Sequence, residues 1–217
     1  MAPDHDKAWD CGTGNGQVAV ALAGYFEEVF ATDISARQLA NATPHDRVCY
    51  GVERAEQTGF ADNSFALVTV AQAIHWFDFE KFYAEVKRTS QPGGILAVIG
   101  YCLTRIEPAI DALIDHFYQK VVGPYWDPER KYLDENYQTI PFPFEEIPLT
   151  PPANNYQWSL AEFTGYLNTW SAVQHYIKAN QQDPMALLLP ELEKLWPGSA
   201  TKTVQFPVLL RVGRIHK

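Results

Sequence analysis

The stretch "AWDCGTGNGQVAVALAGYF", residues 8–26, joins the first predicted strand of the chain to the first predicted helix. A short apolar run ends in Asp10, glycines follow at positions 12, 14 and 16, and a small-residue apolar segment then predicts a helix. Glycines between a strand and a helix allow a sharp turn and keep side chains away from an approaching ligand. The free amides at the helix start point toward the same space. The stretch therefore predicts a ligand-binding loop.

The loop departs from the dinucleotide fingerprint G-x-G-x-x-G, because Gln17 stands where that pattern needs its last glycine. The pattern is instead D-x-G-x-G-x-G, beginning at Asp10. A leading acid repels phosphate and suits an ammonium group. A second acid, Asp33, ends the next predicted strand in "ATDIS", where it suits a bidentate hydrogen bond to ribose hydroxyls. The two acids indicate a nucleoside ligand that carries positive charge and no phosphate.

The first hundred residues alternate between predicted strands and helices. The strands are expected at 8–9, 28–32, 47–50, 65–71 and 95–101, and the helices at 17–26, 36–41 and 79–88. The last two strands are apolar almost throughout, which is typical of central strands covered on both faces. Ser35 can cap the second helix, and "SQPGG" at 90–94 predicts a turn. This alternation favours a parallel sheet with right-handed crossovers.

The second half has a different pattern. We expect a helix at 106–122, an irregular segment at 123–143 and a strand at 144–149. Ser159 and Glu162 form a capping box before one long helix, whose apolar face runs to Ile177. Another helix starts at Asp183-Pro184, and a last strand at 203–215 is interrupted by Pro207.

No linker, repeat or low-complexity segment divides the chain, so we expect one domain over 1–217. Its parts would be a cofactor-binding half at 1–102, a cap or acceptor region at 103–200 and the last strand at 201–217.

Composition narrows the class of protein. Hydrophobic residues make up 47% of the chain and charged residues 20%, as in soluble globular proteins. The absence of a long apolar run and of a signal-peptide pattern predicts a cytoplasmic protein without a membrane partner. A net charge of -9 argues against nucleic acid as a partner. The three cysteines lack metal-ligand spacing, so no metal site is expected.

Residues 8–101 resemble the class I S-adenosylmethionine-dependent methyltransferases, in the type 11 group that includes trans-aconitate methyltransferase and related small-molecule enzymes. The resemblance rests on "DCGTGNG", "ATDIS", "AEQTGFADNSFALVTVAQAIHWFD" and "QPGG", and the closing "VQFPVLLRVGR" is similar to the last strand of that group. It implies an α/β, Rossmann-like fold with a mostly parallel sheet, an antiparallel last strand and an inserted helical cap. It also implies S-adenosylmethionine as the cofactor.

The resemblance implies roles for individual residues. The methionine part of the cofactor would be held by Asp10 and by the loop residues Gly12, Thr13, Gly14, Asn15 and Gly16. Asp33 would bind the ribose, and Ile34 would line the adenine. Ala55 and Glu56 would meet the adenine after the third strand, while Gln72 and Ala73 would lie beside the sulfonium.

"QAIHWF" leaves the fourth strand at the edge where ligands bind in such sheets. His75 is a candidate general base there, and the alternative is that it orders the loop or packs beneath Trp76. A carboxylate acceptor would need no base. Trp76 could face the cationic sulfur, cover the acceptor or pack in the core.

Four further residues are candidates for acceptor binding. They are Tyr166, Trp170 and His175, on or near one long helix, and Arg211, which could fix a carboxylate. For each of them ordinary packing or a surface position is the alternative.

The expected function is a methyltransferase that acts on a small molecule, by O-methylation of a carboxylate. The alternatives are a lipid or quinone acceptor, and a non-catalytic domain that binds the cofactor or a partner. Members of the group carry helices before the first strand that fold over the cofactor, whereas only "MAPDHD" precedes it here. We therefore expect the N-terminal lid to be absent, with either a homodimer through the exposed face or weak cofactor binding as the consequence.

Overall fold

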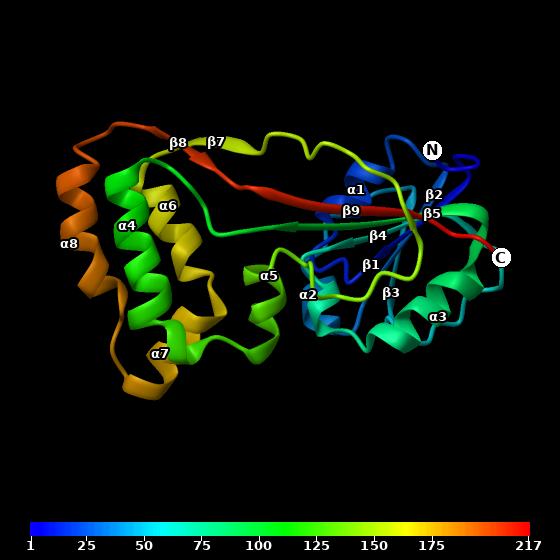
Figure 1. Cartoon of the computed structure of the whole chain (residues 1–217), viewed down its shortest axis with the longest axis horizontal. Coiled ribbons are helices and arrows are strands. Elements are labelled where there is room, and N and C mark those ends of the chain that lie inside the picture. The colour runs from blue at the N-terminus through cyan, green and yellow to red at the C-terminus, as the bar shows by residue number, and fades with distance from the viewer. The chain divides into compact units, whose positions relative to one another are not determined.

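The computed structural model describes all residues, 1–217, and divides the chain into two compact units (Figure 1). Unit 1 contains residues 1–101, 135–151 and 209–217, and unit 2 contains 102–134 and 152–208. The segment 135–151, which we expected within the cap, thus belongs to the unit that carries the glycine loop. A hydrogen bond of 2.5 Å from the Tyr83 hydroxyl to the Pro141 carbonyl helps to hold this segment against the rest of unit 1.

Unit 1 is built on a seven-stranded sheet in the order β3-β2-β1-β4-β5-β9-β6. The strands are β1 (Lys7–Cys11), β2 (Glu28–Asp33), β3 (Val48–Val52), β4 (Phe65–Ala71), β5 (Ser90–Tyr101), β6 (Glu145–Glu146) and β9 (Val208–Arg214). Strands β1 to β5 pair in parallel, and β6 pairs antiparallel to β9. The apolar β4 lies at the centre, as its composition predicts. The mostly parallel α/β sheet confirms the predicted fold class.

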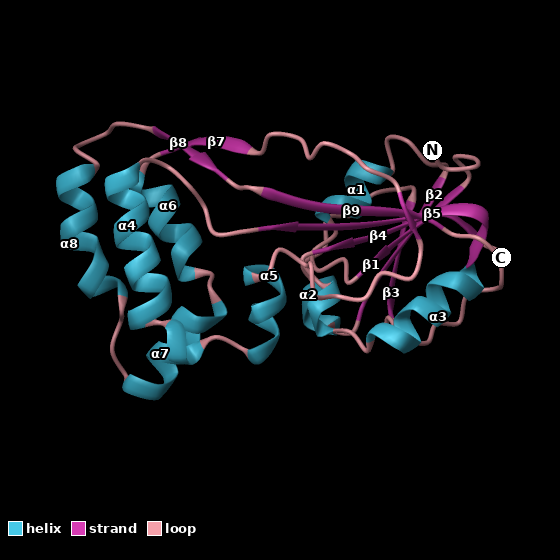
Figure 2. Ribbon diagram, viewed as in Figure 1, coloured by secondary structure: helices cyan, strands magenta, loops and turns pink.

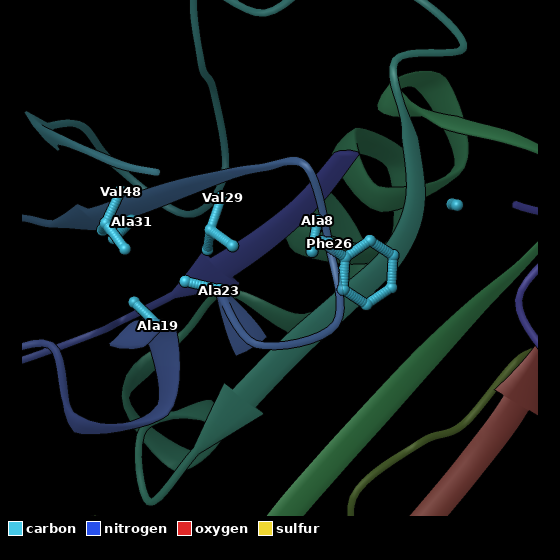
Figure 3. Packing of buried hydrophobic residues seen from close by; sticks show 8 residues of the cluster. Ala8, Ala19, Ala23, Phe26, Val29, Ala31 and Val48 are labelled. Atoms are coloured by element: carbon cyan, nitrogen blue, oxygen red, sulfur yellow. The ribbon is translucent and has the colours of Figure 1, made fainter. Parts of the chain in front are cut away.

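Helices cover both faces of this sheet. Neighbouring residues of a strand point to opposite faces, so apolar residues in succession present a surface for helices on each side. The helices of unit 1 are α1 (Gln17–Leu22), α2 (Ala36–Leu39) and α3 (Phe79–Thr89). On one face, Ala8 belongs to a buried hydrophobic cluster with Ala19 of α1 (Figure 3). On the other face, the Trp9 ring lies 6.4 Å from the Phe82 ring of α3. The predicted cap of α2 is confirmed, since Ser35 Oγ accepts a hydrogen bond from the Gln38 amide.

The turn predicted at 90–94 is wrong, because β5 already begins at Ser90. Gly93 adopts a φ of 77°, which a glycine tolerates without strain, and the register between β4 and β5 shifts between Phe65 and Leu67. The Gly93 amide donates to the Ile215 carbonyl, and the Ile215 amide donates to the Gly94 carbonyl. The glycines therefore act as an irregularity within a strand.

Unit 2 is mostly helical (Figure 2). It contains α4 (Pro108–His116), a π-helical turn (Phe117–Val121), two 3₁₀ turns (Gly123–Tyr125 and Pro128–Arg130), α5 (Lys131–Asp134), α6 (Leu160–Asn168), α7 (Ser171–Asn180) and α8 (Met185–Leu195). Strand β7 (Asn155–Trp158) pairs antiparallel with β8 (Lys202–Gln205). The last predicted strand is interrupted at Pro207, as expected, and forms β8 and β9. No helix is long and apolar enough to cross a membrane.

The capping box of Ser159 and Glu162 is confirmed at the start of α6. The single long helix predicted behind it is wrong, because α6 ends at Asn168 and α7 begins at Ser171. Between them Trp170 has extended backbone angles, with φ -64° and ψ 131°. The break places its indole among other aromatic rings, including Tyr118 at 5.8 Å and Trp126 at 5.5 Å between centroids.

Candidate functional site

The three loop glycines all have positive φ values, 69° at Gly12, 59° at Gly14 and 84° at Gly16, but they serve different purposes. A Cβ on Gly12 would lie 2.6 Å from the Ala73 Cβ, and one on Gly16 would lie 2.2 Å from the Tyr50 hydroxyl. A Cβ on Gly14 would meet nothing within 4 Å. Close packing therefore requires glycine at two positions, whereas the third faces open space that a ligand could use.

The outer side of the loop is attached to the segment before β3. The Asn15 carbonyl accepts a hydrogen bond from the Thr43 amide at 3.1 Å. The Tyr50 hydroxyl donates to the Thr43 carbonyl at 2.7 Å. Tyr50 is a site residue that the sequence did not reveal, because only the fold brings its ring against Gly16.

Asp10 lies near the end of β1 and is 1% exposed. Its two carboxylate oxygens accept hydrogen bonds from the hydroxyls of Thr13 at 2.5 Å and Thr69 at 2.7 Å. Burial raises the pKa of Asp10 to about 6, although the two hydroxyl bonds act to lower it. A buried carboxylate of this kind is stabilised by a nearby positive charge. Asp10 thus lies buried at the start of the loop, and its part in holding the cofactor stays a prediction.

Asp33 ends β2 and holds the loop from the other side. One carboxylate oxygen accepts from the Gly14 amide at 2.9 Å, and the other accepts from the Ser35 amide at 2.8 Å. A carboxylate can accept about four hydrogen bonds, so the two oxygens retain capacity for a ligand. The same side chain can therefore shape the loop and bind hydroxyl groups.

A cavity of about 200 Å³ opens in unit 1 beside Asp33. Its lining consists of Gly12, Asp33, Ile34, Glu53, Arg54, Ala55, Glu56, Ala73, Trp76 and Phe77. Seven of these were predicted from the sequence, and Glu53, Arg54 and Phe77 were not. The missing pair Glu53 and Arg54 could have been found, because both directly follow β3 at the edge where ligands bind.

The cavity is acidic on one side and apolar on its rim. Glu56 accepts a hydrogen bond from the Asp78 amide at 3.1 Å and lies 3.6 Å from Arg54. Ile34 and Trp76 are 65% and 55% exposed, which is unusual for large apolar side chains next to a cavity. An exposed apolar rim of this kind suits a flat aromatic ligand such as a nucleobase. The residues thus fit a cationic nucleoside.

His75 and Gln72 do not line the cavity. His75 is 7% exposed, its Nδ1 lies 3.2 Å from the Tyr137 hydroxyl, and its ring lies 5.1 Å from that of Trp76. The Gln72 side chain donates to the Tyr101 carbonyl at 3.2 Å. This geometry favours the alternative in which His75 orders the loop after β4.

The contacts of Arg211 favour the alternative of ordinary packing over acceptor binding. Its guanidinium donates to the carbonyls of Tyr137 at 3.0 Å and Ile140 at 2.7 Å. It also binds both carboxylate oxygens of Glu146, at 2.5 and 3.3 Å, and lies over the Phe142 ring. These contacts use the hydrogen-bond donors that a substrate carboxylate would need. Arg211 therefore attaches the segment 135–151 to β9.

The other three acceptor candidates lie within unit 2. The ring of Tyr166 packs against Trp158 and Phe206, and Trp170 is buried. His175 Nδ1 lies 3.0 Å from the Tyr125 carbonyl. Tyr166 and Trp170 are 6.0 Å apart between ring centroids. Their part in binding an acceptor stays a prediction.

Comparison with known proteins gives consistent matches. A family model described as a methyltransferase domain matches residues 9–98. A Dictyostelium discoideum protein named "Putative methyltransferase" is 36% identical over 192 residues, which cover 87% of this chain and 72% of that protein. A solved structure from Anaeromyxobacter dehalogenans, described as a "Putative Type II Methyltransferase", is 39% identical with a TM-score of 0.91, covering 99% of this chain and 92% of that one.

A more distant structure, from Bacillus halodurans C-125, is described in the same terms as a methyltransferase. It is 20% identical with a TM-score of 0.57, and it covers all of this chain and 95% of its own. At that identity the match shows a shared fold only.

Proposed function

Because the chain belongs to the class I S-adenosylmethionine-dependent methyltransferases, we propose that it transfers a methyl group to a carboxylate oxygen of a small molecule. When bound, S-adenosylmethionine supplies a methyl group on a sulfonium, which is already activated for transfer to a nucleophile. The protein then has to bind the cofactor, align the acceptor and keep water out.

The cavity beside Asp33 is the proposed cofactor site. Asp33 would accept hydrogen bonds from the ribose hydroxyls, and Ile34 and Ala55 would contact the adenine. The open space at Gly14 leaves room beside the loop, and the buried negative charge of Asp10 favours a cation there. Thr13, Asn15, Gly16 and Gln72 would shape this site from outside the cavity lining.

The buried position of His75 is the observation that supports a carboxylate acceptor. No histidine lines the cavity, and Nδ1 of His75 is engaged with Tyr137. A hydroxyl acceptor must lose a proton as the methyl group arrives, whereas an ionised carboxylate is already nucleophilic. Alignment in a water-poor site would then supply most of the acceleration, with Trp76 covering the reacting groups.

An assay with methyl-labelled S-adenosylmethionine and a panel of small mono-, di- and tricarboxylic acids tests this function. A methyl ester releases its label as methanol in alkali, whereas a methyl ether keeps it. We expect alkali-labile label with at least one acid and none with the corresponding methyl esters. The Asp33→Ala variant provides the control for cofactor binding at the proposed site.

Other results would replace the proposal. Alkali-stable label on quinols or phenols, with none on the acids, would favour a quinone or lipid acceptor. Cofactor binding by calorimetry without release of S-adenosylhomocysteine across both panels would favour a non-catalytic binding domain.

A further inference from the structure

We propose that Tyr137 is a positioning residue for the candidate cofactor site. Its hydroxyl fixes His75 in the Nδ1–H tautomer and, through Gln72 and His75 together, holds Ala73 in the cavity wall. The effect on cofactor binding rests on the proposed function of the cavity, whereas the tautomer does not.

The hydrogen-bond directions follow from the donors available. The Gln72 Nε2 donates to the Tyr101 carbonyl at 3.2 Å, which turns its Oε1 toward the Tyr137 hydroxyl at 3.4 Å. Because Oε1 can only accept, the single hydroxyl proton of Tyr137 is given to Gln72. The contact of 3.2 Å between Tyr137 and His75 Nδ1 then needs a proton from the imidazole. His75 is therefore protonated on Nδ1, and in the neutral ring Nε2 carries the lone pair.

The fold holds Tyr137 firmly enough for this role. Its side chain is 0% exposed and its backbone adopts a φ of 57°, which is uncommon for an aromatic residue. A Cβ on Gly100 would lie 2.6 Å from the Tyr137 ring, so β5 has a glycine where the ring approaches. Arg211 also donates to the Tyr137 carbonyl at 3.0 Å. Ring and backbone are thus fixed independently.

Gln72 and His75, which contact the Tyr137 hydroxyl, stand on either side of Ala73 in the sequence. Gln72 has a positive φ of 53°, and its amide donates to the Ile99 carbonyl at 2.9 Å. Ala73 lines the cavity and approaches Gly12 so closely that a Cβ on Gly12 would lie 2.6 Å away. A shift of Gln72 or His75 would therefore move the cavity wall against the glycine loop.

Heteronuclear NMR of the histidine ring nitrogens at alkaline pH, where the imidazole is neutral, reads the tautomer directly. We expect the wild-type protein to show His75 protonated on Nδ1. The variant Tyr137→Phe removes the acceptor oxygen, and Gln72→Leu removes the oxygen that accepts the Tyr137 proton, which Nδ1 can then accept. In both variants we expect the Nε2–H form to become the major one.

The matched control is Tyr83→Phe. It removes a buried hydroxyl that also binds the segment 135–151, at the Pro141 carbonyl, but has no contact with His75. We expect it to keep the Nδ1–H form. In calorimetry with S-adenosylmethionine, Tyr137→Phe should bind on the order of fivefold more weakly than Tyr83→Phe, the scale of one lost hydrogen bond.

An Nε2–H form of His75 in the wild-type protein would overturn the proposal. An Nδ1–H form that persists in Tyr137→Phe or in Gln72→Leu would also overturn it. Equal dissociation constants for Tyr137→Phe and Tyr83→Phe would overturn the role in positioning. Failure of the proposed function has a separate signature, since it leaves the tautomers as expected and yields no labelled ester.

Discussion

Replacing Asp10 with asparagine should stabilise the protein and weaken cofactor binding at once. The carboxylate is 1% exposed, and its two oxygens accept hydrogen bonds from the hydroxyls of Thr13 and Thr69. Burial raises its pKa from an ordinary value of 3.8 to about 6, so the native fold binds the proton more tightly than the unfolded chain does. The stability that comes from the protonated form is complete below about pH 3.8 and is lost as the pH rises through 6.

The size of the effect on stability follows from the difference between the two pKa values of Asp10, 3.8 and about 6. Each pH unit corresponds to about 1.4 kcal/mol, so ionised Asp10 lowers the free energy of unfolding at neutral pH by about 3 kcal/mol. In Asp10→Asn the amide must donate to one of the two threonine hydroxyls, and one disturbed hydrogen bond costs about 1 kcal/mol. We expect Asp10→Asn to raise the free energy of unfolding at neutral pH by about 2 kcal/mol.

Urea titrations of the ligand-free protein between pH 4 and neutral pH measure this change in the free energy of unfolding. The difference between Asp10→Asn and the wild type should grow as the pH rises through about 6. Calorimetry should show weaker binding of S-adenosylmethionine to the variant. Wild-type affinity should also fall as the pH drops below about 6, because protonation removes the negative charge.

Glu85→Gln is the matched control with the opposite sign. Glu85 is also buried, and burial acts to raise its pKa, but hydrogen bonds from Arg88 and Thr58 lower it below the ordinary value. Its ionised form is therefore stabilising, and Glu85→Gln should lower the free energy of unfolding at neutral pH. An Asp10→Asn variant that is less stable than the wild type by the same amount at every pH would refute the conclusion that ionised Asp10 destabilises the fold.

Four further substitutions separate binding from folding. Gly14→Ala and Gly93→Ala both place a Cβ in open space at a positive φ. Thermal melts should therefore show that both variants lose about 1 kcal/mol of the free energy of unfolding. Calorimetry should show loss of cofactor binding for Gly14→Ala alone. Asp33→Ala should weaken S-adenosylmethionine binding by about 1.5–3 kcal/mol, the scale of hydrogen bonds to a charged group, and unchanged affinity in a folded variant would remove the ribose assignment. Arg211→Met should lower the free energy of unfolding in urea by about 2–4 kcal/mol, because two carbonyls and Glu146 lose their donor, and an intact melt would contradict its structural role.

Local sequence patterns were enough to predict the sheet and the place of the glycine loop. Apolar runs of strand length alternate with helical periods over the first hundred residues, and each such signal is local, because it depends on the period of side chains along one element. Asp10 and Asp33 could be placed for the same reason, since a residue at the end of a parallel strand lies at a known edge of the sheet. Ser35 and Ser159 were equally predictable as caps, because a cap bonds to an amide three residues away.

The contacts between distant segments could not be predicted from local patterns and became known from the folded structure. Nothing periodic in residues 135–151 indicates that they belong with β9, yet Arg211 and Tyr83 bind their carbonyls. The same segment brings Tyr137 against His75 across 62 positions of sequence, and β3 brings Tyr50 against Gly16. Such pairs are set by the packing of whole elements, and an isolated polar or aromatic residue carries no signal of its eventual neighbour. The roles of Arg211 and His75 were therefore decided by the fold, whereas the glycine loop was already specified by its local pattern.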